Sequence, residues 1–410
     1  MLSLAPWSAN DREAETLAIH RNFEISACSD LAGFFDSSDV GSQCAARKNI
    51  VLATTFTLEG RFAVAHHFQI QHLALAIDDP SRLLAQQPDQ MLGMFRRAVG
   101  PHELAPGRVR LEVHGDLDRA VHREAVPRVW QGTLESVAFA VSRRGSRRRI
   151  ELPGRAVLDF HVDQRWAQLC LPNGVDAAAT WFLLLRFVCD CLTRGGHSFV
   201  HGACLAVPRR DGWGGVVLSA PSNTGKTTTA LALANSGWRL LGDDITYVRP
   251  PHLGSGLWGF PRVCHVRPGS FAMLPWLADL EFGAPSADGV RAIPLANLGG
   301  RAWVDAPWLA PMLVVALAPP NRKTTRVEPI DRAQALSLLG SESISAVREP
   351  NNDDAARDFV TLGRLICAAP ACRLSVGPDP SDAAQKLEDF INANQIAAPQ
   401  RGAFFQRRTA

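Results

Sequence analysis

The sequence predicts an α/β domain in the second half of the chain, preceded by a sheet-rich α+β domain. The chain has 410 residues, which is longer than one ordinary domain. Residues 214–247 combine an apolar strand, a loop, a helix and a second strand, an order typical of an α/β sheet. Residues 106–171 instead alternate between apolar and polar positions in short runs, which indicates a sheet. Hydrophobic residues make up 46% and charged residues 20% of the chain, so both domains are expected to be globular.

The N-terminal domain is placed at residues 1–173, with substrate or partner recognition as one interpretation of its role. Strands are expected at 108–113, 136–142, 156–162 and 166–171 because of their alternation.

Two groups of charged or titratable residues stand out in this domain. A basic run at 142–149 forms a glycine-centred turn, interpreted either as a solvated hairpin tip or as a contact for an acidic peptide or a phosphate. His66, His67 and His72 lie close together, but no acidic or cysteine residue accompanies them at metal-ligand spacing. A partly buried strand or helix face is therefore favoured over a metal site.

A helix is expected at residues 177–193, ending near the double glycine at 195–196. We expect its apolar face to pack against the central sheet of the second domain. That domain is accordingly placed at 174–396, followed by a loose tail at 397–410.

Composition and charge exclude several classes of protein. A net charge of +3 gives no basis for binding nucleic acid or a membrane surface. The longest apolar stretch, 177–188, contains Arg186 and is too short to cross a bilayer. The first ten residues lack the pattern of a signal peptide, and the nine cysteines show no paired spacing. A reduced, cytoplasmic protein is the simplest interpretation.

The second domain contains a candidate phosphate-binding loop. Residues 220–227 read Ala-Pro-Ser-Asn-Thr-Gly-Lys-Thr, which matches the pattern Gly-x4-Gly-Lys-Ser/Thr except that Ala220 replaces the first glycine. Such loops direct backbone N–H groups and a helix N-terminus at phosphate. The candidate nucleotide-binding residues are Ser222, Asn223, Thr224, Gly225, Lys226, Thr227 and Thr228.

The surroundings of the loop favour a site over an exposed turn. A helix is expected at 227–236, closed by Gly237 in a left-handed cap. A strand at 238–241 then delivers Asp243 and Asp244 to its carboxyl end, where α/β sheets bind ligands.

The stretch from 199 to 244 resembles the HPr kinase/phosphorylase family and its kinase-only relatives, which share a phosphate-loop core with the phosphoenolpyruvate carboxykinases. The similarity rests on Phe-Val-His-Gly-Ala at 199–203, on the loop, and on Leu-Leu-Gly-Asp-Asp at 240–244, in the same order and spacing. The resemblance implies a P-loop kinase domain with a mixed sheet that uses ATP and Mg²⁺. Weaker similarity continues to residue 391.

Two features depart from the bifunctional members of this family. Their Glu-x-Arg-Gly-x-Gly segment is absent, since residues 258–263 read Trp-Gly-Phe-Pro-Arg-Val. The N-terminal half also does not look like their regulatory domain. The chain is therefore more similar to the kinase-only relatives, and its residues give no support for the extra metal-binding glutamate or for the phosphorylase activity that depends on it.

The expected mechanism assigns a role to each group. Lys226 and the loop amides hold the β- and γ-phosphates, while Thr227 and one aspartate hold Mg²⁺. The resemblance assigns Asp243 as the base and Asp244 as the metal-side partner, although the residues alone do not separate them. His201 is delivered beside the loop, in either a catalytic or a structural role.

An arginine is also expected to neutralise the transferring phosphate. Arg262, His265 and Arg267 follow the carboxylates, and Arg267 is chosen among them. Residues 250–259 are expected to be a loop near the active edge, and 275–300 a lid or substrate loop. A buried strand is expected at 312–317 and a helix at 382–394.

Four functions are compatible with the sequence. The leading one is a kinase that phosphorylates a hydroxyl, expected to be serine, on a protein or a small ribosomal peptide; such a chain is also compatible with a homo-oligomer. The alternatives are a small-molecule kinase and a nucleotide-binding switch or scaffold with little turnover. A carboxykinase comes last, because its metal-binding histidine and lysine pattern is not evident.

Overall fold

The computed structural model divides into two compact units between Gly195 and Gly196. We call residues 65–195 the N-terminal unit and 196–396 the C-terminal unit. The residues that the structure describes are 65–71, 73–79, 83–84, 92, 95, 109–115, 127–134, 137–161, 166–172, 177–210, 212–250, 254–286, 288–320, 323–347, 353–394 and 396.

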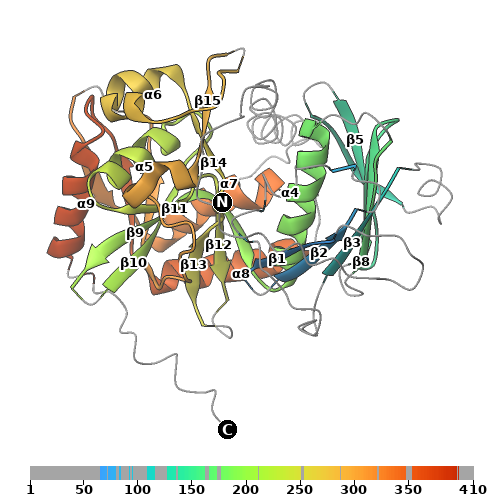
Figure 1. The fold of residues 1–410 in the computed structure, drawn as a ribbon. Coiled ribbons are helices and arrows are strands. Elements are labelled where there is room, and N and C mark those ends of the chain that lie inside the picture. Colours follow the sequence, from blue (N-terminus) through green and yellow to red (C-terminus); the bar gives the residue numbers. More distant parts are fainter. Residues whose placement is uncertain are drawn as a thin grey trace, which may run out of the picture. The chain divides into compact units, whose positions relative to one another are not determined.

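Within the described residues, the N-terminal unit forms an eight-stranded sheet in the order β1-β2-β3-β8-β7-β6-β5-β4 (Figure 1). Strands β2, β3 and β8 are mutually parallel, and the other pairs are antiparallel. The predicted sheet-rich character is confirmed. The elements are β1 (Ala65–Ile70), β2 (Leu73–Asp78), β3 (Val109–His114), β4 (Arg128–Leu134), β5 (Val137–Arg144), β6 (Arg147–Leu152), β7 (Ala156–His161), β8 (Trp166–Cys170) and α4 (Ala177–Arg194).

Helix α4 packs against the sheet of the N-terminal unit. Phe187 on the helix contacts Phe160 on β7 with ring centroids 5.6 Å apart. Asp190 accepts a hydrogen bond of 3.0 Å from Arg148 on β6. The prediction that this helix packs on the sheet of the second domain is therefore wrong, and the division falls after the helix instead of near residue 173. An apolar face can be read from periodicity, but the sheet that it covers cannot.

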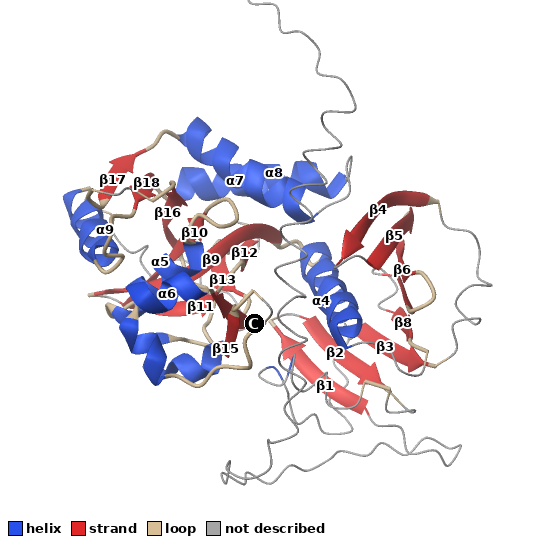
Figure 2. Ribbon diagram, turned by 90° about the horizontal axis from the view of Figure 1, so that it is seen from above, coloured by secondary structure: helices blue, strands red, loops and turns tan. Residues whose placement is uncertain are grey.

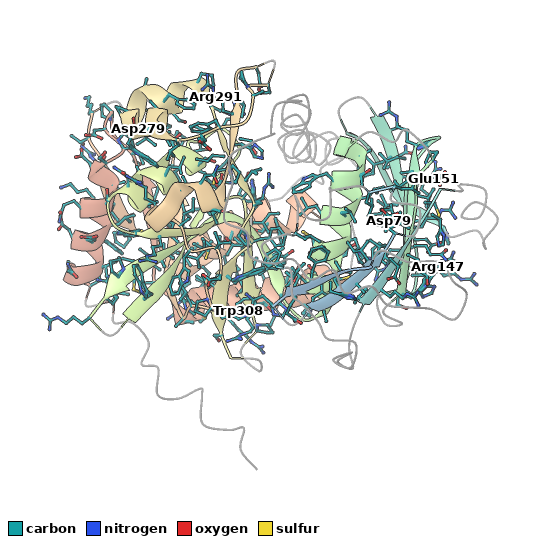
Figure 3. The ribbon with its side chains drawn as sticks, viewed as in Figure 1. Asp79, Arg147, Glu151, Asp279, Arg291 and Trp308 are labelled. Atoms are coloured by element: carbon teal, nitrogen blue, oxygen red, sulfur yellow. The ribbon has the colours of Figure 1, made fainter. Side chains whose placement is uncertain are left out.

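The basic run lies around a turn at Gly145, whose φ is 59°. Arg144 and Gly145 at the turn are exposed, whereas the arginines on β6 are buried or half-buried. Figure 3 labels Arg147 and Glu151 of this strand. Arg147 bonds Asp159 at 2.6 Å, and Arg149 lies 3.8 Å from Glu151. The basic run is therefore largely neutralised within the N-terminal unit.

His66 and His67 lie on β1, and His72 falls outside the described residues. Across the described ranges, no group of three or more His, Cys, Asp or Glu side chains is placed to hold a metal ion. No helix in the same ranges is long and apolar enough to cross a membrane.

The C-terminal unit is an α/β unit with a mixed sheet, as predicted. Its strand order is β13-β12-β9-β10-β16-β18-β17, and β11 pairs with β9. Strands β10, β16 and β18 are parallel, whereas β9, β12 and β13 pair in antiparallel fashion. The strands of this sheet are β9 (Ser198–Arg209), β10 (Gly212–Ser219), β11 (Arg239–Gly242), β12 (Ile245–Arg249), β13 (Gly256–Gly259), β16 (Pro311–Leu317), β17 (Arg326–Pro329) and β18 (Ala371–Ser375), and a separate hairpin joins β14 (Val263–Val266) to β15 (Arg291–Pro294).

Helices cover both faces of this sheet (Figure 2). Alternate strand residues face opposite sides, so Leu205 and Val216 pack with α5 and α9, while Cys204 and Val217 pack with α7 and α8. The helices are α5 (Lys226–Asn235), α6 (Pro268–Met273), α7 (Arg332–Val347), α8 (Asp353–Ala368) and α9 (Asp382–Ala393), with 3-10 turns η4 (Pro275–Asp279) and η5 (Leu295–Arg301).

Two segments that were predicted as loops, 250–259 and 275–300, contain regular structure instead. Residues 256–259 form β13, which pairs with β12 in antiparallel fashion. Residues 275–300 are not one continuous loop, because they include η4, β15 and most of η5, and Leu277 and Leu298 are fully buried in the core. The strand at β16 and the helix α9 are confirmed, whereas α8 was not predicted.

Candidate functional site

The site is built on strand β9, whose twelve residues hold two parts of the sheet together. His201 pairs with Ile245 of β12, and Gly202 pairs with Ser219 at the end of β10. The Ser219 hydroxyl donates to the carbonyl of His201 at 3.0 Å. This register places His201 between the loop that follows β10 and the carboxylates that precede β12.

The loop leads directly into α5. Asn223 has φ 67° and Gly225 has φ 96°, so both residues are in the left-handed conformation. Glycine and asparagine adopt this conformation at a lower energetic cost than most other residues. The helix begins at Lys226 and ends before Gly237, whose φ is 101°, so the predicted left-handed closure is confirmed. The first amides of α5 therefore point out of the helix end beside the loop.

The loop side chains differ in exposure. Ser222 and Asn223 are exposed and Thr224 is half-buried. Thr228 is buried, and its hydroxyl lies 2.6 Å from that of Ser270 on α6. The structure thus leaves the start of the loop open to a ligand and fixes its end.

Lys226 is buried and joins His201 to Asp244. Its Nζ lies 2.7 Å from His201 Nε2 and 2.7 Å from Asp244 Oδ1. Since a lysine ammonium only donates, His201 Nε2 must be an acceptor and the ring must be neutral. Burial and the charge of Lys226 also lower the pKa of His201, in agreement with a neutral ring.

Asp243 is bound by the next residue of the loop. Thr227 Oγ1 donates to Asp243 Oδ2 at 2.7 Å. The other carboxylate oxygen, Oδ1, is buried and has no hydrogen-bond partner among the described residues. Burial and the neighbouring charge of Asp244 raise the pKa of Asp243 to about 6. A buried oxygen of this kind is a place for a cation or a proton.

Asp244 has the opposite electrostatic character. Burial alone would raise its pKa, but the charge of Lys226 holds that pKa well below its usual range. Its φ of 68° turns the side chain toward Lys226 while its carbonyl accepts the Gly202 amide at 3.1 Å. Two adjacent acids therefore face different partners.

A close backbone contact holds these acids in place. A Cβ added to Gly242 would lie 2.6 Å from the carbonyl oxygen of Phe260, and one added to Gly259 would lie 2.5 Å from the Gly242 amide nitrogen. Both positions therefore require glycine. This contact brings the segment after β13 beside Asp243.

That segment supplies a buried arginine. Arg262 is 5% exposed, and its charge lowers the pKa of both aspartates and of His201. Arg267, the residue chosen from the sequence, is exposed, and the carboxyl group whose pKa it lowers is that of Asp288. The structure thus brings Arg262, and not Arg267, to the aspartates.

Two residues of the site were missed by sequence reasoning. Ser343 on α7 accepts a hydrogen bond of 3.1 Å from the His201 amide, and Glu342 Oε2 lies 3.9 Å from His201 Nδ1. Burial raises the pKa of Glu342. No local motif marks these residues, because they reach the site only through the packing of α7 on the sheet.

A magnesium ion fits the loop-side pair. Thr227 and the unpartnered Oδ1 of Asp243 are hard oxygen ligands, and Mg²⁺ in nucleotide sites commonly takes only one or two protein oxygens, with water and phosphate completing the shell. The absence of a three-ligand group among the described residues is compatible with that chemistry.

Comparisons with protein-family models and with curated proteins find no match. Among solved structures, the chain is similar to the Hpr(Ser) kinase/phosphatase from Coxiella burnetii, at 12% sequence identity and a TM-score of 0.24. The matched region spans 48% of this chain and 99% of that chain. Values this low do not establish a shared fold, so the chemistry of the site rests on the residues of this chain.

Proposed function

We propose that the C-terminal unit is an ATP- and magnesium-dependent kinase that transfers the γ-phosphoryl group to a hydroxyl, that of a serine in a protein or small peptide. One observation carries the proposal. Lys226 and Thr227, adjacent in the loop, are each bound to one of two adjacent aspartates, at 2.7 Å in both cases. In such kinases the loop lysine binds phosphate and the loop hydroxyl binds the metal ion, and here each of these two groups contacts a carboxylate.

The loop and α5 would hold the nucleotide phosphates. The first amides of α5 lack partners within the helix, and the positive end of the helix dipole favours anions. Lys226 adds a charge beside these amides. We infer that Lys226 breaks its ion pair with Asp244 when ATP binds and contacts the β- and γ-phosphates instead.

The geometry favours Asp243 as the metal-side carboxylate, the reverse of the assignment made from sequence resemblance. Thr227 and Asp243 would hold Mg²⁺, which neutralises charge on the transferring group. The pKa of Asp243, raised to about 6, reflects burial and the neighbouring charge of Asp244, and a bound cation would favour its charged form. The raised value is thus no argument against a metal-side role.

Asp244 is then the residue that orients the acceptor hydroxyl. Its side chain is 16% exposed, which makes it accessible to a substrate. Release of Lys226 to the phosphates removes the charge that holds its pKa low, so Asp244 becomes a better proton acceptor. Phosphoryl transfer demands little of a base beyond this, because its transition state is loose.

The proposal is tested by incubating the protein with Mg²⁺ and ATP labelled at the γ-phosphate, with serine-containing peptides and proteins as acceptors. Transfer of label is expected for the native chain, and Lys226→Met should lower it at least about a hundredfold. Asp288→Asn, an exposed change in the same unit, should leave it unchanged. Label on free amino acids or sugars only would favour a small-molecule kinase, and tight ATP binding without transfer would favour a scaffold.

The two aspartates should separate kinetically. Asp243→Asn is expected to raise the Mg²⁺ concentration needed for half-maximal transfer, because it removes an anionic oxygen ligand. Asp244→Asn is expected to lower kcat about a hundredfold or more at saturating Mg²⁺, with little change in the Kd of ATP. The opposite pattern in a titration of Mg²⁺ against rate would restore the original assignment.

A further inference from the structure

Arg262 and His265 form a buried pair beside the candidate site. Arg262 Nη2 lies 2.9 Å from His265 Nε2, and the two residues are 5% and 9% exposed. Arg262 lies in the short connection between β13 and β14, whereas His265 lies within β14. The contact therefore joins a residue outside regular structure to one fixed in a strand.

The direction of this hydrogen bond is set by chemistry. A guanidinium group is always protonated and has no acceptor, so Arg262 must donate and His265 Nε2 must accept. The ring of His265 is therefore neutral, with its proton on Nδ1. This is the same relation as between Lys226 and His201, so both cations of the site donate to a neutral imidazole.

Strand β14 holds the His265 ring on the side of Arg262. Cys264 and Val266 are fully buried in the hydrophobic core, and the residue between them must point the other way. The strand is itself fixed by pairing with β15, where His265 stands opposite Ala292. The position of the His265 ring is thus fixed by the strand, and the hydrogen bond from Arg262 to this ring fixes the arginine side chain in turn.

Arg262 keeps donor capacity after this bond. Its Nε is buried and has no hydrogen-bond partner among the described residues. The close backbone contact of Gly242 with Gly259 and Phe260 brings the segment that carries Arg262 beside the residue that precedes Asp243 and Asp244, and the charge of Arg262 also lowers the pKa of both carboxyl groups. A buried cation with an unused donor near two acids is suited to an anion that arrives between them.

We propose that His265 is a positioning residue that holds the guanidinium of Arg262 for the transferring phosphoryl group. The proposal rests on the proposed function and adds to it a residue that does not touch the substrate. Without an acceptor at Nε2, the long Arg262 side chain regains other rotamers. The loss should appear in the chemical step, because phosphoryl charge changes most in the transition state.

The test replaces His265 by Gln, whose amide oxygen can accept near the Nε2 position, and by Leu, which cannot accept. Under the transfer assay above, His265→Leu is expected to lower kcat about tenfold or more, with the KM for ATP nearly unchanged. His265→Gln should recover most of this loss. In an Arg262→Met background, His265→Leu should have little further effect. Equal losses for Gln and Leu, or additive losses with Arg262→Met, would overturn the proposal.

A second readout does not depend on activity. In protein labelled with ¹⁵N-histidine, the Nε2 resonance of His265 should have the shift of an unprotonated acceptor and should move in Arg262→Met. An unchanged resonance would refute the positioning contact. A native chain that keeps this signature but transfers no label would instead refute the proposed function, so the two failures are distinguishable.

Discussion

Individual backbone angles mark the candidate site. Within the described ranges, the non-glycine residues with a left-handed φ are Gln71, Asn223 and Asp244, and two of the three belong to the site. Such conformations cost about 1 to 3 kcal/mol each and persist only where the surroundings hold them. At Asn223 the small polar side chain reduces that cost. At Asp244 it is offset by the ion pair with Lys226.

Gly242 tests how tightly the acids are held. Gly242→Ala is expected to destabilise the C-terminal unit by about 2 kcal/mol or more, because the new Cβ would press on the Phe260 backbone. Urea unfolding measures the change in free energy, and phosphoryl transfer should fall with it.

The matched control is Gly363→Ala. Gly363 lies on α8, and a Cβ added there meets nothing within 4 Å. Replacing glycine in a helix by alanine should stabilise the protein by about 0.5 to 1 kcal/mol. If both variants shifted stability in the same direction, the close contact at Gly242 would not be what constrains this position.

At the scale of elements, α7 contributes more to the site than covering the sheet. Ser343→Ala removes the acceptor of the buried His201 amide. The unsatisfied N–H group should cost about 1 to 3 kcal/mol in the free energy of unfolding. Transfer activity should also fall, because this hydrogen bond holds the backbone of His201, whose ring accepts a hydrogen bond from Lys226.

Ser337→Ala provides the comparison on the same helix. Ser337 is exposed, so the change is expected to stay within about 0.5 kcal/mol. Thermal unfolding and the rate of transfer would be measured for both variants. A Ser343→Ala protein as stable and active as Ser337→Ala would mean that α7 does not support His201.

At the scale of the whole molecule, the two units should respond differently to nucleotide. A ligand that binds only the folded C-terminal unit raises the stability of that unit, by about 2.7 kcal/mol at a hundred times its Kd. Calorimetry with ATP and Mg²⁺ is therefore expected to move one unfolding transition and leave another in place. EDTA should reverse most of the shift. A single transition that moves as a whole would show that the units unfold together.

Local signals account for the parts that the sequence predicted well. The loop, α5 and its closure are encoded within one short stretch of sequence, by Gly225, Lys226 and Gly237. Strand alternation in β3 and the continuous apolar run of β16 are equally local. Such features need no knowledge of what lies across the fold.

The parts that were missed depend on distant partners. Arg262 reaches the acids because Gly242 and Gly259 touch, and Ser343 reaches His201 across 142 residues of sequence. The sheet covered by α4 is likewise chosen by long-range packing with Phe160. The hydrophobic period of a helix carries no information on which of two sheets will receive it.

The burial of α5 has a consequence for the newly made chain. This helix has apolar residues on all sides and packs against α9, and beside it the Trp238 indole donates to Glu388, 150 residues later, at 3.1 Å. At synthesis rates of about 5 to 20 residues per second, roughly 8 to 30 seconds separate their appearance. During that interval Leu231 and Leu233 lack part of their cover, so a ribosome-bound fragment ending before α9 should attract chaperones and should bind ATP poorly.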